Sequence, residues 1–285
     1  MSDFTSFKIG GPVFCWAEAE DMDGVLEAVA IAEAFGKPLA VIGKGSNILA
    51  QEKGFDGVLV NLGKGFDYIE VGDSDIVKAG AGLSIFSLVR ECAGLGLAGC
   101  EFLAGIPGSL GGAIFMNAGV RDEKDNRRLK EIKDIVVDVD TLDLKDKKRK
   151  SLNRDEIDFS YRSSGLDGKC ILGASIKLKK DEKSSIDGRI YSFMKKRAWM
   201  GRLGFPTAGS VFKNPDDARP AGRLIEECGL KGRRSGSAEI SSVHANFIVN
   251  TGGATSKDVL ELVELARKNV RDRFSIDLEL ELKII

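Results

Sequence analysis

The spacing of apolar residues along the chain predicts a mixture of short helices and strands. Met22, Val25, Leu26, Val29 and Ala32 recur at the spacing of one helical face, and the Gly36–Pro38 segment ends that helix. Short apolar runs are typical of buried strands, and we expect such strands at 39–43, 58–62 and 76–79, followed by a helix at 84–93.

The second half of the chain shows the same mixture. Strands are expected at 135–144 and 170–178, with the basic run Lys145–Lys150 as the solvated turn of a hairpin, and a helical segment at 184–200. Thr255-Ser256-Lys257-Asp258 is typical of a capping box and opens a helix to about Phe274. From Ile276 to Ile284 apolar and charged residues alternate as in a half-buried strand. Without a regular βα alternation the pattern favours the α+β class, with a boundary near residue 182.

Composition narrows the function. The 285 residues carry 42 basic and 43 acidic side chains, and this net charge of −1 argues against a nucleic-acid binder. One histidine and five cysteines without C-x-x-C spacing argue against a metal site or a disulfide framework. Because no apolar run approaches the roughly 20 residues that span a membrane, and because the first residues do not resemble a signal peptide, we expect a cytoplasmic protein without membrane insertion.

Glycine is abundant: 34 of the 285 residues, or nearly 12%, are glycine. The average usage in proteins is roughly 7%. One glycine segment, Gly43-Lys44-Gly45-Ser46-Asn47, follows a predicted strand, and its backbone N–H groups could converge on an anion. It has neither Walker A nor Rossmann spacing, and a plain tight turn is an equal alternative. Gly105-Ile106-Pro107-Gly108-Ser109-Leu110-Gly111-Gly112, followed by Asn117 and Gly119, is a second such loop, with a packing role as its alternative. Two loops of this kind indicate a large, phosphate-bearing ligand.

A set of fragments gives the sequence a specific resemblance. TSFKIGGP (5–12), GKGSNIL (43–49), AGIPGSLGGAIFMNAG (104–119), YRSS (161–164), AGSVFKNP (208–215), AGRLIEECGLKG (221–232), HANFIVN (244–250) and LELELKII (278–285) occur in this order. Together they resemble the family of UDP-N-acetylenolpyruvoylglucosamine reductases, flavin enzymes of peptidoglycan precursor synthesis. The chain is similar to the shorter, second type of this family, which lacks an extra tyrosine-bearing segment.

The resemblance implies a fold and its cofactors. It implies an FAD-binding region of the vanillyl-alcohol-oxidase (PCMH) type at 1–182, in two α+β subdomains split near 75–85, and an α+β substrate-binding domain at 183–285. NADPH would reduce the flavin, and FAD would be bound without a covalent link because no histidine occurs in the glycine loops. The implied FAD contacts are Gly43, Lys44, Gly45, Ser46, Asn47, Gly105, Ile106, Pro107, Gly108, Ser109, Gly111, Gly112, Asn117 and Gly119.

The resemblance also implies catalytic residues. Arg162 matches the family's carboxylate-binding arginine, Ser210 the serine that gives a proton to C2, and Glu281 the second acidic residue. The pattern alone does not separate Glu281 from Glu279, since both belong to the polar face of the last predicted strand. A planar guanidinium grips a carboxylate with two hydrogen bonds, which suits the pyruvyl group of the substrate.

The implied contacts to the UDP-sugar are Lys213, Asn214, His244 and Arg197. The chain departs from the family pattern after Gly119, where it reads Val120-Arg121-Asp122, and at 199–202, where Trp-Met-Gly-Arg replaces the usual Gln-Pro. These departures leave two alternatives open, a flavin oxidase or dehydrogenase of the same fold and a nucleotide-binding protein without activity. We expect a monomer that binds the UDP-sugar and NADPH.

Overall fold

The computed structural model describes residues 1–72, 75–121, 129–216 and 219–285. They form two compact units. The first unit consists of Met1–Phe14, Lys44–Asp56 and Ala198–Ile285, and the second of Cys15–Gly43 and Gly57–Arg197. Both contain helices and strands in irregular order, which confirms the predicted α+β class.

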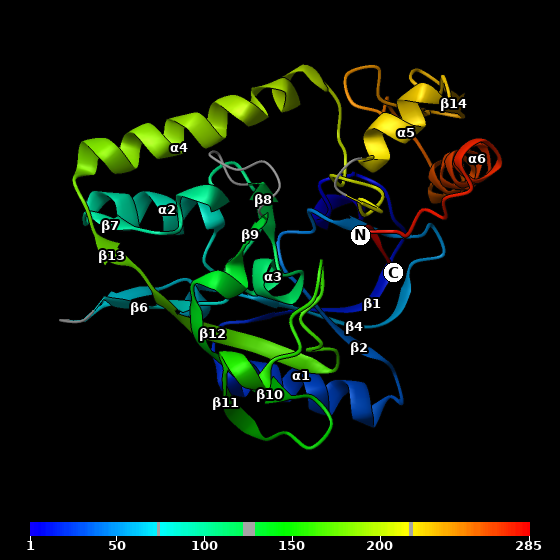
Figure 1. The fold of residues 1–285 in the computed structure, drawn as a ribbon. Coiled ribbons are helices and arrows are strands. Elements are labelled where there is room, and N and C mark those ends of the chain that lie inside the picture. The colour runs from blue at the N-terminus through cyan, green and yellow to red at the C-terminus, as the bar shows by residue number, and fades with distance from the viewer. Residues whose placement is uncertain (73–74, 122–128, 217–218) are drawn as a thin grey trace. The chain divides into compact units, whose positions relative to one another are not determined.

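The larger sheet of the second unit has five antiparallel strands in the order β11-β10-β12-β6-β5. Their bounds are β5 Ile69–Val71, β6 Ile76–Gly80, β10 Val136–Asp143, β11 Arg149–Asn153 and β12 Lys169–Lys177. Helices α2 (Ile85–Gly94), α3 (Leu110–Phe115) and α4 (Lys183–Arg197) accompany it, and α2 and α4 lie side by side (Figure 1). The core between these helices and the sheet contains Val77, Val139 and Ile176, all fully buried.

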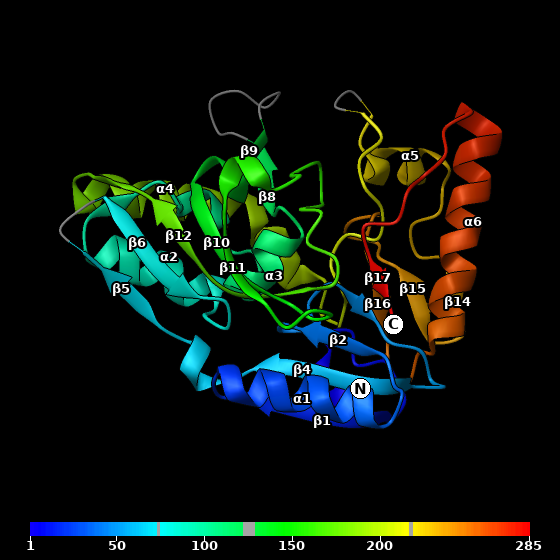
Figure 2. The ribbon, with the colours of Figure 1, turned by 90° about the horizontal axis from the view of Figure 1, so that it is seen from below.

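A smaller sheet of the second unit has the order β1-β4-β2 and is accompanied by α1, as Figure 2 shows. Its elements are β1 Val13–Ala19, α1 Met22–Ala34, β2 Leu39–Ile42 and β4 Phe55–Leu62. The Asp21 carboxylate accepts the Gly24 N–H at 2.9 Å and so caps α1. Strands β2 and β4 are parallel, and their register places Ile42 beside Asn61. This pairing places the polar residue Asn61 beside the end of β2.

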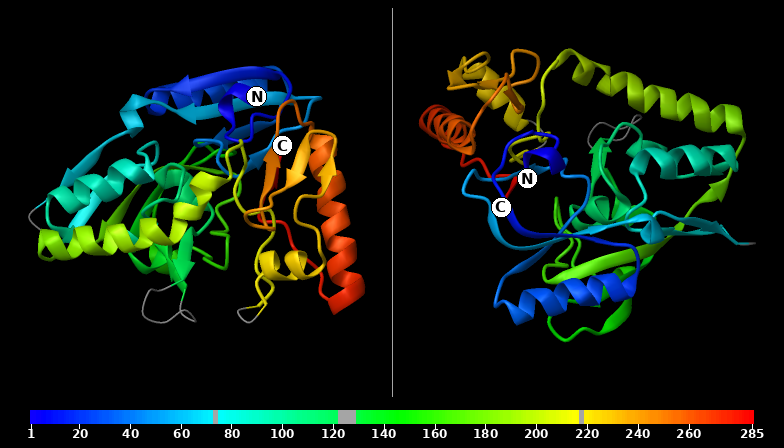
Figure 3. Two further views of the ribbon diagram at one scale, coloured as in Figure 1. Left: turned by 90° about the horizontal axis from the view of Figure 1, so that it is seen from above. Right: turned by 180° about the vertical axis from the view of Figure 1, so that it is seen from behind.

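The first unit packs around one long helix, α6 (Ser256–Phe274), which lies beside β14 and β15 (Figure 3). The predicted capping box at Thr255 and Asp258 is formed, and Val259, Leu262 and Val270 are buried. The other elements of this unit are β3 Ile48–Leu49, α5 Ala221–Glu227, β14 Arg234–Ser235, β15 Ala238–Ile240, β16 Ile248–Asn250 and β17 Lys283–Ile284.

Short elements complete the described chain. The remaining strands are β7 Leu97–Ala98, β8 Gly119–Arg121, β9 Leu129–Glu131 and β13 Lys179–Lys180. The 3-10 helices are η1 Ser2–Phe4, η2 Lys64–Phe66, η3 Glu101–Leu103, η4 Ile132–Asp134, η5 Arg154–Glu156 and η6 Ala198–Arg202. Residues 122–128, which contain much of the departure after Gly119, lie outside the described residues.

The compact units differ from the boundary expected after residue 182. Helix α4 belongs to the second unit, because Ile186 packs on Ala93 and Ala98 and Phe193 enters the main core. Residues 1–14 and 44–56 belong to the first unit, because their apolar side chains (Phe7, Ile9 and Leu49) are part of its core. The first unit is therefore assembled from three separate segments of the chain.

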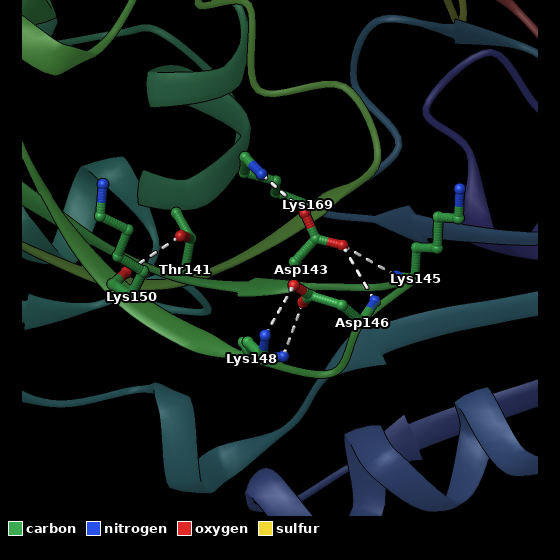
Figure 4. A network of polar contacts seen from close by, with 7 residues as sticks. All are labelled: Thr141, Asp143, Lys145, Asp146, Lys148, Lys150 and Lys169. Atoms are coloured by element: carbon green, nitrogen blue, oxygen red, sulfur yellow. Dashed lines mark hydrogen bonds and ion pairs between the residues drawn. The ribbon is translucent and has the colours of Figure 1, made fainter.

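The hairpin between β10 and β11 has the predicted basic turn, and its tip is organised by Asp143 (Figure 4). One carboxylate oxygen of Asp143 accepts the N–H groups of Lys145 at 3.0 Å and Asp146 at 3.2 Å, and the other accepts the Lys169 ammonium at 2.8 Å. The bond from Lys169, with the two backbone N–H groups, lowers the pKa of Asp143 from 3.8 to about 2.

We expect Asp143→Asn to make the free energy of unfolding of the second unit less sensitive to acid. Because the folded pKa is depressed, the carboxylate stabilises the fold above its ordinary value, and this contribution is lost as pH falls from about 4 toward about 2. Urea unfolding between pH 2 and 6 should therefore show a shallower pH dependence for the variant. Asp167→Asn, at an exposed turn residue, is the matched control and should retain the wild-type slope. Parallel wild-type and Asp143→Asn curves would contradict the role of this carboxylate.

Candidate functional site

The two glycine loops meet inside the second unit. A Cβ added at Gly43 would lie only 2.6 Å from the Ser109 hydroxyl oxygen, so the two loops touch there and a side chain at Gly43 would clash with Ser109. The Asn61 amide donates to the carbonyls of Ile42 at 2.8 Å and Gly43 at 3.0 Å and thereby holds the turn that follows β2. The structure thus brings Gly43 and Ser109, both predicted cofactor contacts, next to each other.

The second loop is joined by its backbone to the segment between β6 and α2. Leu110 N–H donates to Leu83 at 2.8 Å, Gly111 N–H to Ala81 at 2.9 Å, and Ile85 N–H to Gly108 at 3.0 Å. Ser109 is buried, and its hydroxyl accepts the Gly112 N–H at 3.4 Å at the start of α3. These bonds hold the loop in a defined path against the main core.

Backbone donors remain available in this loop. Within the described part of the chain, the N–H groups of Gly105 and Gly108 donate to no protein acceptor. Such groups bind the phosphates of nucleotide cofactors in glycine-rich loops. Together with the close approach of Gly43 to Ser109, where only glycine avoids a clash, these donors fit backbone binding of a phosphate-bearing cofactor such as FAD.

We expect Gly43→Ala to weaken cofactor binding by roughly fivefold or more. The added methyl group would displace Ser109, a predicted FAD contact, and loss of one hydrogen bond of about 1 kcal/mol to the cofactor lowers the affinity roughly fivefold. Flavin fluorescence during titration of the FAD-free protein measures the affinity. Gly188→Ala is the control, because a Cβ there meets nothing within 4 Å on the exposed face of α4. Equal affinities of Gly43→Ala and wild type would contradict the role of this turn.

Arg162 lies against the end of the second glycine segment. Its Nη2 donates to the Gly119 carbonyl at 3.3 Å, and its guanidinium lies over the Tyr161 ring, 4.9 Å from the centroid. Asn117 is fully buried, and its amide donates to the Ser160 carbonyl at 2.9 Å. The predicted catalytic Arg162 and two predicted cofactor contacts, Asn117 and Gly119, therefore lie together in the second unit.

Arg197, predicted to contact the substrate, lies against the predicted cofactor loop. Its Nη1 donates to the Gly105 carbonyl at 3.3 Å, and its Cδ would be 3.1 Å from a Cβ at Gly105. The side chain comes from the last residue of α4. Helix α4 in turn is held to the core by Arg189, which pairs with Glu101 and Asp181 at 2.7 Å.

Ser210 lies at the start of an extended segment in the first unit. Val211 N–H donates to the Asn246 carbonyl at 2.9 Å, and the Asn246 side chain both accepts from Phe212 N–H at 3.0 Å and donates to its carbonyl at 2.8 Å. On the other side, Glu281 N–H donates to the Val211 carbonyl at 2.9 Å. Ser210 and Glu281, far apart in the sequence, are thus neighbours in this unit.

The first glycine loop reaches the same place. Asn47 donates through its side chain to the Glu281 carbonyl at 3.1 Å. Gly45 has a φ of +62°, and a Cβ there would collide with the Phe4 carbonyl, so this position requires glycine. The predicted cofactor contact Asn47 therefore helps to position the predicted catalytic Glu281.

The structure separates the two acidic residues that the pattern left open. The Glu279 side chain is 77% exposed and pairs with Lys213 at 3.4 Å, and its carbonyl accepts the Lys213 N–H at 2.9 Å. Glu281 is half-buried and is bonded through its backbone to Val211, next to Ser210, and to Asn47. Asn214 accepts the Ala221 N–H at 3.0 Å and so opens α5. Of the two acids, Glu281 has the closer connection to the Ser210 segment.

His244, the only histidine, is half-buried near this segment. Its Nδ1 accepts the Asn246 N–H at 3.2 Å. Burial, with a smaller effect of Lys231, lowers the pKa of His244, so the ring is neutral near pH 7. A neutral imidazole with Nδ1 occupied as an acceptor carries its proton on Nε2 and can donate from there.

Sequence reasoning missed two asparagines that organise these segments, Asn61 and Asn246. Both bond to backbone groups, Asn61 at the end of β2 and Asn246 next to Ser210. The signal for Asn61 was a polar residue at the end of an otherwise buried strand.

Among the described residues no group of three or more metal-ligating side chains is close enough to hold a metal, and no helix has the length and apolarity to cross a membrane.

Comparisons with known proteins agree with both regions. A family model described as the C-terminal domain of UDP-N-acetylenolpyruvoylglucosamine reductase matches residues 201–285, and one described as an FAD binding domain matches residues 15–146. The chain is 38% identical over 288 residues to the UDP-N-acetylenolpyruvoylglucosamine reductase of Bacillus velezensis, covering 100% of this chain and 92% of that protein. The protein of the same name from Bacillus subtilis (strain 168) is 37% identical over the same length and coverage.

A solved structure is similar over nearly the whole chain. The crystal structure of UDP-N-acetylenolpyruvylglucosamine reductase (MurB) from Thermus caldophilus matches with a TM-score of 0.80 and 35% identity, covering 99% of this chain and 96% of that one.

Proposed function

Because the chain belongs to the family of UDP-N-acetylenolpyruvoylglucosamine reductases, we propose that it catalyses the NADPH-dependent reduction of UDP-N-acetylglucosamine enolpyruvate to UDP-N-acetylmuramate. Membership makes it an FAD-dependent oxidoreductase of peptidoglycan precursor synthesis. The observation that carries the proposal is similarity over the full chain, including both matched regions.

The reaction divides the work between the cofactor and the protein. When bound, FAD supplies the hydride that it has received from NADPH, and the hydride goes to C3 of the enolpyruvyl group. Negative charge then develops at C2, in conjugation with the carboxylate of the substrate, and a proton must be added at C2. The protein has to bind the carboxylate, stabilise the developing charge and deliver that proton.

Three side chains are proposed for these steps. Arg162 binds the carboxylate of the enolpyruvyl group and stabilises the charge that spreads onto it. Ser210 gives its hydroxyl proton to C2, which is possible because a carbanion is far more basic than an alkoxide. Glu281 assists stabilisation or proton delivery, and its backbone bond to Val211 supports this role by keeping it beside the Ser210 segment.

Binding roles follow from the remaining positions. We assign FAD, held without a covalent bond, to the glycine loops, where the backbone N–H groups of Gly105 and Gly108 are suited to bind its phosphates. Lys213, Asn214 and His244 are proposed to contact the UDP-sugar, and Arg197, placed on Gly105, is proposed to stabilise the loop as well. The enzyme is proposed to act as a monomer in the cytoplasm, where NADPH and sugar nucleotides are found.

Stopped-flow absorbance tests the function in two steps. NADPH should bleach the flavin of the FAD-loaded protein, and the enolpyruvyl substrate should then restore its colour under anaerobic conditions. A flavin that is not bleached by NADPH would refute the proposal. Fast reoxidation by oxygen, with no turnover of the sugar nucleotide, would indicate an oxidase of the same fold instead.

A further inference from the structure

Trp199, in an aromatic cluster of the first unit around His244, has no role in the function proposed so far. The Trp199 indole stacks on the His244 imidazole, with ring centroids 4.7 Å apart and planes inclined by 20°. Phe247 meets both rings edge-on, at 5.1 Å from Trp199 and 5.2 Å from His244. Leu203 and Val249 are buried with Phe247 in the same cluster. One face of the imidazole is thus covered by the indole.

The imidazole is held on further sides. Nδ1 accepts the Asn246 N–H at 3.2 Å, and a Cβ at Gly222 would lie 2.7 Å from Cε1, so α5 packs directly against the ring. The Asn246 side chain also forms hydrogen bonds with both the N–H and the carbonyl of Phe212, two residues after Ser210. The ring orientation is therefore coupled to the segment that carries the proposed proton donor.

Burial, more than the surrounding charges, keeps the His244 ring neutral. Burial lowers its pKa, Lys231 lowers it further, and Glu226 opposes both. Lys231 and Glu226 form an ion pair at 2.7 Å, so their effects on the ring partly cancel and burial dominates. Any side chain that excludes water from the ring contributes to this burial, and Trp199 covers its face.

We propose that Trp199 is a positioning residue that holds His244 as a neutral Nε2–H donor for an oxygen of the sugar nucleotide. The stacked indole sets the plane of the ring, and the Asn246 N–H sets its tautomer. The identity of the acceptor, a phosphate or sugar oxygen, rests on the proposed function. Without the indole, the ring can rotate and be hydrated, and it would then present a mixture of tautomers.

Because His244 is the only histidine, its ring can be observed directly in the whole protein. Labelling with 15N-histidine gives one imidazole in a two-dimensional NMR spectrum, whose nitrogen shifts report tautomer and pKa. Wild type should show the Nε2–H form with a pKa below the ordinary value of about 6.5. Trp199→Ala should show mixed tautomers and a pKa closer to that value. The KM for the enolpyruvyl substrate should rise roughly three- to tenfold, with kcat changed less than twofold.

Two further variants make the result specific. Trp199→Phe keeps an aromatic face and should retain the wild-type tautomer and most of the substrate affinity. Phe205→Ala removes an exposed aromatic side chain from the same connection, outside the cluster, and should change neither. An unchanged tautomer, pKa and KM in Trp199→Ala would overturn the proposal. So would an equal loss in Phe205→Ala, which would indicate general disturbance of the connection.

The experiment also separates this proposal from the proposed function. If the wild-type enzyme does not reduce the enolpyruvyl substrate, the proposed function fails. The imidazole spectra of the FAD-loaded wild type and Trp199→Ala would still decide whether Trp199 sets the state of His244. Wild-type turnover with identical spectra would instead refute the positioning role alone.

Discussion

Replacing Ser210 by alanine should slow reoxidation of the flavin by the enolpyruvyl substrate roughly 10²–10⁴-fold, the usual contribution of a positioned proton donor. Reduction of the flavin by NADPH should change less than twofold, because this step needs no proton at C2. Among the described residues the Ser210 hydroxyl makes no hydrogen bond, and the position is held through backbone neighbours, so the variant should fold normally. Single-turnover stopped-flow of each half-reaction is the measurement.

A matched serine controls for the loss of a hydroxyl in this unit. Ser242 is exposed and precedes the His244 segment, so Ser242→Ala should keep both half-reactions at wild-type rates. A solvent deuterium isotope effect on reoxidation is expected in wild type, since the proposed step transfers an exchangeable hydroxyl proton to C2. Equal slowing of both half-reactions in Ser210→Ala would show that the serine binds the cofactor and is not the proton donor.

Local patterns predicted the elements whose burial is decided within a few residues. Helices α1, α2 and α6 were expected at nearly their observed positions, because each has an apolar face and a capping residue in its own sequence. Helix α5 was not predicted, since seven residues give little periodicity, and β1 was not predicted because Phe14 is exposed. The last strand was expected from 276 to 284, and Leu278 and Leu282 are indeed buried, but regular pairing is limited to Lys283–Ile284.

In the candidate site, too, some residues could be predicted from the local sequence and others could not. Glycine positions could be predicted because the need for glycine is set by the backbone at that residue, as the positive φ of Gly45 shows. The roles of Asn61 and Asn246 could not, because their partners belong to strands and loops elsewhere in the chain. Likewise, Glu281 and Glu279 are equivalent by alternation. Their different surroundings, Lys213 beside Glu279 and Asn47 beside Glu281, come from segments elsewhere in the chain.

Replacing Arg162 by lysine should lower kcat/KM for the enolpyruvyl substrate by roughly 10- to 100-fold. Loss of a hydrogen bond to a charged group costs about 1.5–3 kcal/mol, and lysine offers a point charge where arginine offers a planar fork. Lysine would also lose the bond to the Gly119 carbonyl and the planar contact with Tyr161. Arg162 has a φ of +59°, and lysine keeps the same backbone strain, so the comparison isolates the guanidinium.

Kinetics of both half-reactions test this assignment. Because the carboxylate belongs to the substrate, the effect should appear in substrate KM and in reoxidation, with flavin reduction by NADPH within a few-fold of wild type. Arg90→Lys, at an exposed arginine of α2, is the matched control and should leave both unchanged. A near-wild-type KM and turnover in Arg162→Lys would contradict the carboxylate-binding role. In that case the bond to Gly119 would make Arg162 a residue that supports the cofactor loop, and FAD affinity would be the property that changes.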